Sequence, residues 1–170
     1  MLMGTDDFAD FVASSSRDLL RSGWLLTGDW PAAEDLVQAA LVATWLRWRE
    51  LGRVEHPEAY VRRVMVTTFM RWRKRRWNGE VTVEQLPDPV RDDDAFHQFE
   101  LHDAVRTALD VLPPRQRAIV VLRYFSGLTE AQTASAMDCA VGTVKSQSAK
   151  ALARLQRVPG LADVLTGGHP

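Results

Sequence analysis

The sequence GLTEAQTASAMDCAVGTVKS, residues 127–146, decides how the rest of the chain is interpreted, because it has the form of two short helices joined by a tight turn. Thr129 offers a hydroxyl N-cap and is followed by an acidic residue, which is a typical helix start. Asp138 tolerates the left-handed backbone that ends a helix. Gly142 then restarts the chain, with Thr143 as the expected cap. The stretch predicts either a helix-turn-helix that reads DNA or a helical hairpin without a ligand.

The spacing of residues gives each of these two helices a buried and an exposed face. The buried face is expected to contain Leu128, Ala131, Ala134 and Met137 in the first helix, and Val144, Ser148, Ala151, Leu152 and Leu155 in the second. Short and polar side chains at the start of a second helix suit the major groove of DNA. The residues predicted to face DNA are Thr143, Lys145, Ser146, Gln147, Ala149 and Lys150.

Length and composition limit the classes of protein to which the chain can belong. Its 170 residues allow one domain or two small ones, and its single cysteine excludes an internal disulfide and argues against a metal cluster. The amino terminus lacks the pattern of a signal peptide, and no apolar run reaches membrane-spanning length. These features predict a cytoplasmic protein without membrane insertion.

The net charge of −1 conceals a segregation of charge along the chain. Basic residues dominate between Arg47 and Arg76, acidic residues dominate from Glu80 to Asp103, and basic residues return from Arg106 to Arg157. The local field, rather than the net charge, governs attraction to phosphate. The pattern therefore predicts two basic modules joined by an acidic connector.

The remaining periodicities predict helices and no strand hairpin. Expected helices cover residues 6–26, 31–50, 57–77 with a short break near residues 66–69, 96–112 and 115–125. The fold class is therefore all-α, with two small helical domains joined by an acidic flexible linker. We expect a first domain over residues 1–78, a linker over 79–95, a second domain over 96–160 and a tail over 161–170.

The basic run between Met70 and Asn78 contains five basic residues and two tryptophans. Arginine pairs with phosphate and an indole can stack on an unpaired base, whereas the alternative is a solvated basic helix whose tryptophans enter a core. For Trp72 the core is favoured by its spacing from Thr68 and Phe69.

Catalytic interpretations find little support in the sequence. The four histidines are scattered without metal-ligand spacing, and no glycine-rich loop is available to cradle a phosphate. We therefore expect no enzyme activity, no catalytic or metal-binding residue and no cofactor.

Taken together, these segments resemble the extracytoplasmic-function (group IV) RNA polymerase sigma factors, of the actinobacterial sigma-E type. The motif AEDLVQ at 33–38, followed by ATW at 43–45, resembles the helix that docks on the polymerase. The motif PEAYVRRV at 57–64 and the basic run after it resemble the part that melts and reads the −10 element. The motifs LPPRQR at 112–117 and VGTVKS at 141–146 resemble the domain that reads the −35 element.

The resemblance implies a promoter-specificity subunit and assigns its contact residues. Those implied for the polymerase clamp are Asp35, Gln38, Trp45 and Arg49. Those implied for the −10 element are Arg63, Thr67, Thr68, Phe69, Arg71, Trp72, Arg73, Lys74, Arg75 and Arg76, among which residues 67–69 match a loop that captures a flipped base.

The partners implied by the family are core RNA polymerase, through its β′ clamp helices and β flap, promoter DNA and an anti-sigma factor. The alternative function is a free-standing helix-turn-helix regulator that binds duplex DNA as a dimer. Such a regulator would protect a palindrome without polymerase.

Overall fold

The computed structural model describes residues 4–54, 56–79 and 100–161, which form helices and turns and, within these ranges, no strand. The first half, residues 4–79, contains α1 (Thr5–Thr27), α2 (Trp30–Leu46), α3 (Trp48–Val54) and α4 (Pro57–Trp77). The second half, residues 100–161, contains α6 (Glu100–Leu109), α7 (Pro114–Val120), the π-helix η1 (Val121–Phe125), α8 (Glu130–Met137) and α9 (Val141–Gln156). The all-α prediction is confirmed for these residues. The predicted linker and tail lie almost entirely outside them.

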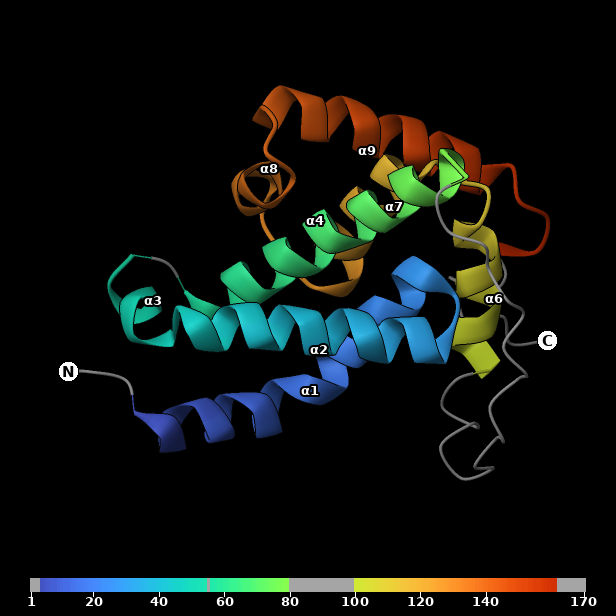
Figure 1. Cartoon of the computed structure of the whole chain (residues 1–170). Helices are drawn as coiled ribbons and strands as arrows, with labels where there is room; N and C mark the ends of the chain where they lie inside the picture. The colour runs from blue at the N-terminus through green and yellow to red at the C-terminus, as the bar shows by residue number, and fades with distance from the viewer. Residues whose placement is uncertain (1–3, 55, 80–99, 162–170) are drawn as a thin grey trace.

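In the first half, α1 and α2 pack against each other, α4 packs on α2, and α8 and α9 lie beyond α4 (Figure 1). The turn between α1 and α2 falls in the gap between the helices predicted over residues 6–26 and 31–50. Gly28 ends α1 with φ of 74°, and the Asp29 carboxylate accepts a hydrogen bond from the Ala32 amide at 2.9 Å. Gly23 allows the close crossing of the two helices, because a Cβ there would lie 3.3 Å from the Ala33 carbonyl oxygen.

Two predictions about the first-half helices are wrong. The expected single helix over 31–50 is divided at Arg47, where α2 ends and α3 begins, so that Trp48 enters a small core and donates a hydrogen bond to the Gly4 carbonyl at 3.1 Å. The expected break near residues 66–69 is absent, because α4 runs continuously through Val66 and Phe69. Both side chains are 2% exposed, and their burial offsets the weak helix propensity of β-branched and aromatic residues.

The helix-turn-helix is formed by α8 and α9. Thr129 and Gln132 make a capping box, with bonds of 3.1 and 2.8 Å, and Asp138 adopts the predicted left-handed conformation at φ 50°. The second helix starts earlier than predicted, since its N-cap is Ala140, and Thr143 lies inside it.

The faces of these two helices follow the predicted spacing only in part. In α9 the buried residues are Val144, Ser148 and Ala151, as expected, although Leu152 is exposed. In α8 the buried set is Thr133, Ala134 and Ala136, whereas Ala131 is exposed. Of the predicted face, Leu128 and Ala134 are buried and Met137 is half-buried against the core, so the prediction fails at Ala131.

The two halves share one core. A single buried cluster contains Leu25, Leu36 and Phe69 from the first half together with Leu112 and Val121 from the second. The prediction of two helical domains did not include this packing of one domain on the other.

Candidate nucleic-acid interface

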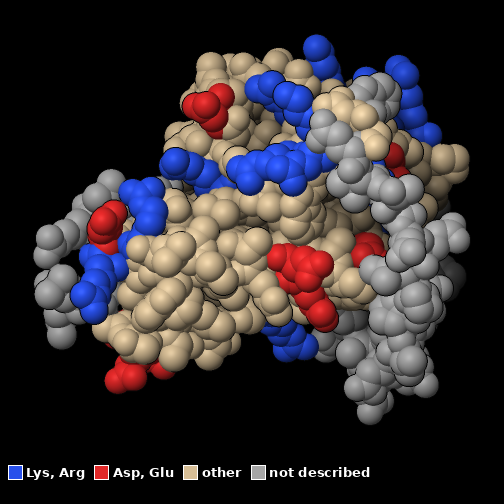
Figure 2. All heavy atoms as spheres, in the orientation of Figure 1, with Lys and Arg blue, Asp and Glu red and all other residues tan. Residues whose placement is uncertain are grey.

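A row of basic and hydroxyl side chains runs along the exposed face of α4. Arg63, Thr67 and Arg71 are exposed and recur every four residues, so they lie on one side of the helix. Lys74, Arg75 and Arg76 extend the exposed set to the end of α4. Figure 2 shows a row of basic side chains across the molecule over α4, with acidic side chains below it over α2 and another acidic group above it at the upper left. This row has the charge and spacing for successive phosphate contacts.

Four predicted −10 residues on the same helix are not fully exposed, and the first of them, Thr68, is half-buried. Phe69 is 2% exposed and belongs to the core, and Trp72 is half-buried and packs against that core, as its spacing predicted. Arg73 is half-buried, and its burial, followed by the charges of Arg76 and Arg106, lowers its pKa. Arg73 therefore lies beside the second half of the chain. A DNA contact by Phe69 stays a prediction.

The second helix of the helix-turn-helix presents its first turns outward. Lys145, Ser146, Ala149 and Lys150 are exposed, while Val144 and its partners hold the opposite face in the core. Short side chains at Ser146 and Ala149 leave room for the edge of a base pair to approach the helix.

Two predicted −35 residues are engaged within the protein. The Gln147 amide oxygen accepts a hydrogen bond from Gln116 of α7 at 3.0 Å, and the oxygen of Gln116 accepts one from Arg154 at 3.2 Å. Thr143 is half-buried, and its carbonyl accepts a hydrogen bond from the Ser146 hydroxyl. The two bonds of Gln116 fix the orientation of α9 on α7.

Glu130, which the sequence analysis treated only as a first-turn acid, pairs with two cations. Its carboxylate lies 3.7 Å from the Lys145 ammonium and 3.9 Å from the Arg123 guanidinium. Because Lys145 is 65% exposed at its side chain, this pair is weak and can be exchanged for a phosphate. Glu130 and Lys145 are too far apart in the sequence for their spacing to predict this ion pair.

The end of α2 exposes an apolar patch beside the predicted polymerase contacts. Asp35, Gln38 and Arg49 are exposed. The periodicity of the sequence predicts Trp45 on the buried stripe of its helix, and this prediction is wrong, since Trp45 is 43% exposed. Val42 and Leu46 are 60% and 77% exposed and were missed. The sequence could have revealed them, because α2 is apolar on more than one face. Such a helix is expected to pack on its own core with one face and on a partner protein with another.

A cleft lies beside the contact of α4 with α8 and is lined by both helices and by the turn after α8. From the first half it is lined by Arg47, Tyr60, Arg63, Val64, Thr67, Thr68 and Arg71, and from the second by Ala134, Ser135, Ala136, Asp138 and Cys139. Its volume is about 660 Å³. The predicted −10 residues Thr67 and Thr68 therefore face a wall made by the second half.

Across the described ranges there is no group of three or more residues suited to hold a metal ion. None of the described helices is long and apolar enough to cross a membrane.

Comparison with known proteins identifies the family. Sigma-70 region 2 matches residues 11–78, and Sigma-70, region 4 matches residues 102–155. The RNA polymerase sigma-E factor of Streptomyces avermitilis is 40% identical over 150 residues, which cover 88% of this chain and 83% of that protein. The chain belongs to the sigma-70 family, in its extracytoplasmic-function type.

Other relatives agree with this assignment. The RNA polymerase sigma-E factor of Streptomyces coelicolor is 39% identical over 88% of this chain and 84% of its own length. The sigma factor RpoE of Bartonella quintana, solved in complex with the anti-sigma factor NepR, has a similar fold, with a TM-score of 0.65 at 23% identity over 94% of this chain and 99% of its own. The predicted function is thereby confirmed: this sigma factor binds core RNA polymerase and promoter DNA and directs promoter-specific initiation. The free-standing regulator is not favoured.

Proposed function

We propose that this sigma factor holds the polymerase with α2 and grips the promoter twice, with α4 at the −10 element and with α9 at the −35 element. The observation that carries the proposal is that α4 and α9 each expose a face with basic side chains. These helices lie in the segments matched to regions 2 and 4. One domain, residues 1–78, supplies the first grip, and a second domain, residues 96–160, supplies the other.

At the −10 element, phosphates are held by the exposed basic row of α4, which consists of Arg63, Arg71, Lys74, Arg75 and Arg76. Thr67 and Thr68 contact an extruded base. Extruding a base costs a few kcal/mol of unstacking, which nearby cations offset. Phosphate contacts release counterions, so binding weakens as salt rises. Trp72 and Arg73 support the row from the protein side.

At the −35 element, Lys145, Ser146, Ala149 and Lys150 face the major groove. The bond between Gln116 and Gln147 supports this role because it holds the recognition helix on α7. Gln147 and Thr143 act at the edge of the contact, where they can position α9 even without touching a base.

At the polymerase, Asp35, Gln38, Trp45 and Arg49 contact the β′ clamp helices, and the second domain contacts the β flap. The exposed apolar side chains of Val42 and Leu46 extend this surface. An apolar centre with a charged rim is the usual anatomy of a protein interface.

The chain acts as a binding subunit without catalysis of its own. It acts in the cytoplasm, because that is where its two partners, polymerase and promoter DNA, are found. An anti-sigma factor is a further partner, by analogy with the complex of RpoE and NepR in Bartonella quintana.

The experiment that tests this function is transcription in vitro with the core polymerase of Streptomyces coelicolor and sheared genomic DNA of the same organism. Sequencing the 5′ ends of the transcripts should reveal starts that depend on this chain and share two upstream sequence blocks. The absence of any start beyond those made by core polymerase alone would refute the function.

Two substitutions test the assignment of surfaces. Lys145→Ala should weaken initiation at the selected promoter while leaving core binding unchanged, and Asp35→Ala should weaken core binding first. If both variants lose only thermal stability, the surfaces are assigned wrongly.

A further inference from the structure

The second helix of the helix-turn-helix carries a lysine that is paired with a carboxylate of the first. The Lys145 ammonium lies 3.7 Å from one oxygen of the Glu130 carboxylate, and the other oxygen lies 3.9 Å from the Arg123 guanidinium. Exposure of the side chains rises through this cluster, from 25% at Arg123 through 37% at Glu130 to 65% at Lys145. Glu130 therefore lies between a cation on the protein side and a cation on the solvent side.

Local structure fixes the Glu130 end of this cluster. The Arg123 guanidinium also donates a 2.6 Å hydrogen bond to the Leu128 carbonyl, which ties it to the loop before α8. Glu130 is the first residue of α8, where the capping box holds the backbone and the positive end of the helix dipole favours a carboxylate. Glu130 is thus a fixed acceptor, and the flexible member of the pair is Lys145, whose charge lies at the end of a four-carbon stem.

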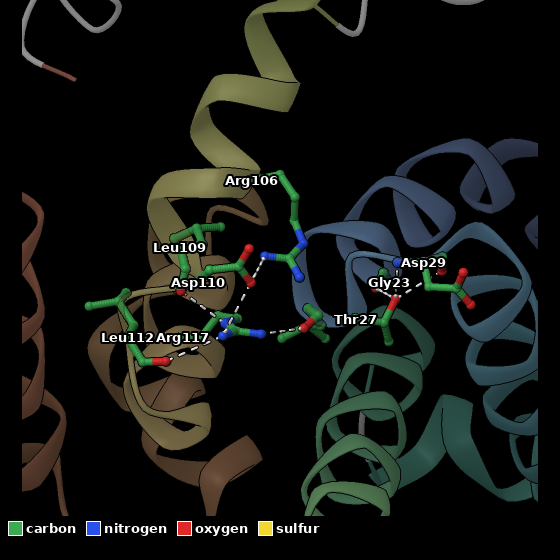
Figure 3. A network of polar contacts seen from close by, with 9 residues as sticks. Gly23, Thr27, Asp29, Arg106, Leu109, Asp110, Leu112 and Arg117 are labelled. Atoms are coloured by element: carbon green, nitrogen blue, oxygen red, sulfur yellow. Dashed lines mark hydrogen bonds and ion pairs between the residues drawn. The ribbon is translucent and has the colours of Figure 1, made fainter. Parts of the chain in front are cut away.

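The basic residues of the second half differ in whether DNA can reach them. Arg117 is 3% exposed and donates hydrogen bonds to three backbone carbonyls, among them that of Leu26 in α1 at 3.1 Å (Figure 3). Its donors are used inside the protein, so its role is structural. Lys145 is the opposite case, because an ammonium has three N–H donors and an exposed pair with one carboxylate leaves donors for a further acceptor.

The position of Lys145 on α9 determines which acceptor that is. Lys145, Ser146 and Ala149 are exposed on the face of α9 that the proposed function directs into the major groove. The pair with Glu130 restricts the directions in which the lysine stem extends along this face. A restrained donor loses less conformational entropy when it meets a base edge.

The acceptors that DNA offers to this ammonium differ in charge. Guanine presents the neutral acceptors O6 and N7 in the major groove, whereas the backbone presents anionic phosphates. A neutral acceptor can share the ammonium with the Glu130 carboxylate. A phosphate that takes the ammonium instead lies beside a carboxylate that is fixed in place and repels it. Glu130 therefore penalises the phosphate contact, which carries no sequence information, more than the base contact, which does.

We propose that Glu130 is a specificity-determining residue that acts through Lys145: its carboxylate directs the ammonium to a guanine of the −35 element and opposes its binding to phosphate. The inference rests on the proposed function, because it takes α9 as the helix that reads the −35 element. The residue that touches DNA is Lys145, so Glu130 is a positioning residue. Its removal lowers sequence discrimination and raises affinity for DNA of any sequence.

Transcription from a pool of promoters tests the inference. The pool contains a promoter found in the experiment above together with every single base-pair change in its −35 block. Holoenzyme reconstituted with the core polymerase of Streptomyces coelicolor transcribes the whole pool in one reaction, and counting the transcripts gives the preference at each position. Lys145→Ala then identifies the position that Lys145 reads, as the one where the wild-type preference is lost.

At that position the wild-type chain should prefer its best base pair by about tenfold. Glu130→Gln keeps the size of the side chain and removes its charge, so it should reduce this preference to about threefold or less and leave the other positions unchanged. In the Lys145→Ala background it should have no further effect there. The matched control is Asp138→Asn, which removes a carboxylate from the same helix-turn-helix, retains the left-handed turn and should keep the wild-type profile.

Three results would overturn the inference. They are a Glu130→Gln preference within twofold of wild type at the Lys145 position, an equal effect of Glu130→Gln with and without Lys145, and an equal loss of preference at every position, which would indicate a structural role. If the wild-type chain shows no preference in the −35 block, or if Lys145→Ala changes none, the proposed function fails instead. The two failures are therefore distinguishable.

Binding to a duplex without promoter sequence gives a second, independent measurement. Lys145 and Lys150 are exposed in the chain itself, so this binding is measured without polymerase, by fluorescence anisotropy over a range of salt concentrations. Glu130→Gln should bind the duplex several-fold tighter than Asp138→Asn, which loses the same charge. Its slope of log affinity against log salt should steepen by about one, because Lys145 then contacts phosphate. Equal affinities of the two variants would overturn the inference.

Discussion

The packing of Arg106 over Gly28 can be measured with a single methyl group. Gly28→Ala places a Cβ on a residue with φ of 74°, which costs about 1–2 kcal/mol for any L side chain. The same Cβ overlaps the Arg106 guanidinium, so that side chain must leave its position and weaken its bond to Asp110. Overpacking of this kind costs about 1–3 kcal/mol, at the lower end here because Asp110 is largely exposed.

The matched control is Gly127→Ala. Gly127 has φ of 70°, and a Cβ there would meet nothing within 4 Å, so only the backbone cost applies. Urea unfolding followed by tryptophan fluorescence should show Gly28→Ala less stable than Gly127→Ala by about 1 kcal/mol. Trp24 and Trp30, stacked at 5.3 Å beside this turn, report on the region.

The double variant with Arg106→Ala completes the test. Without the guanidinium, Gly28→Ala should cost only the backbone penalty, giving a coupling free energy of about 1 kcal/mol in a double-mutant cycle. Equal losses for Gly28→Ala and Gly127→Ala, or a coupling near zero, would refute the packing of Arg106 on Gly28.

Three other predictions concern separate surfaces. Thr129→Ala removes the capping box of α8 and should lower the free energy of unfolding by about 1 kcal/mol, whereas Thr129→Ser should retain most of it; equal urea midpoints for the two variants would count against the cap. Arg75→Gln should reduce the slope of log affinity against log salt by about one for every promoter tested, as expected of a phosphate contact, and a loss confined to one sequence would indicate base reading instead. Leu46→Glu should weaken binding to core polymerase without moving the urea midpoint, because that side chain is 77% exposed; a drop in stability would mean that it packs within the protein.

Local chemistry made much of the fold predictable. Several helix ends depend only on neighbours within four residues, and a sequence shows such neighbours directly. They are the caps at Asp29 and Thr129, the left-handed residues Gly28 and Asp138, and the start of α7 at Pro114. The basic face of α4 was likewise visible as a run of charge.

Features that depend on distant partners were not predictable. Val66 and Phe69 have weak helix propensity, yet their burial keeps α4 continuous, because tertiary packing overrides propensity. Arg117 looked like one more basic residue of a basic module, whereas its carbonyl partners include one 91 positions away. No periodicity encodes such a contact, and for the same reason the core shared by the two halves and the partial burial of Gln147 were missed.

The π-helical turn η1 has a consequence for how this chain tolerates changes in length. A π-turn carries one residue more than an α-helical turn, and the amide of Ser126 here bonds to the carbonyl of Val121 at 2.9 Å, five residues back. One residue rotates an α-helix by about 100°. The Ser126 hydroxyl is hydrogen-bonded to that of Ser22 at 3.2 Å. Deleting any residue of 121–125 would therefore move Ser126 away from Ser22 and rotate the helix-turn-helix of α8 and α9 relative to α7. Such a deletion changes the rotation of everything that follows it. We therefore expect it to redirect α9 although the sequences of α8 and α9 stay the same.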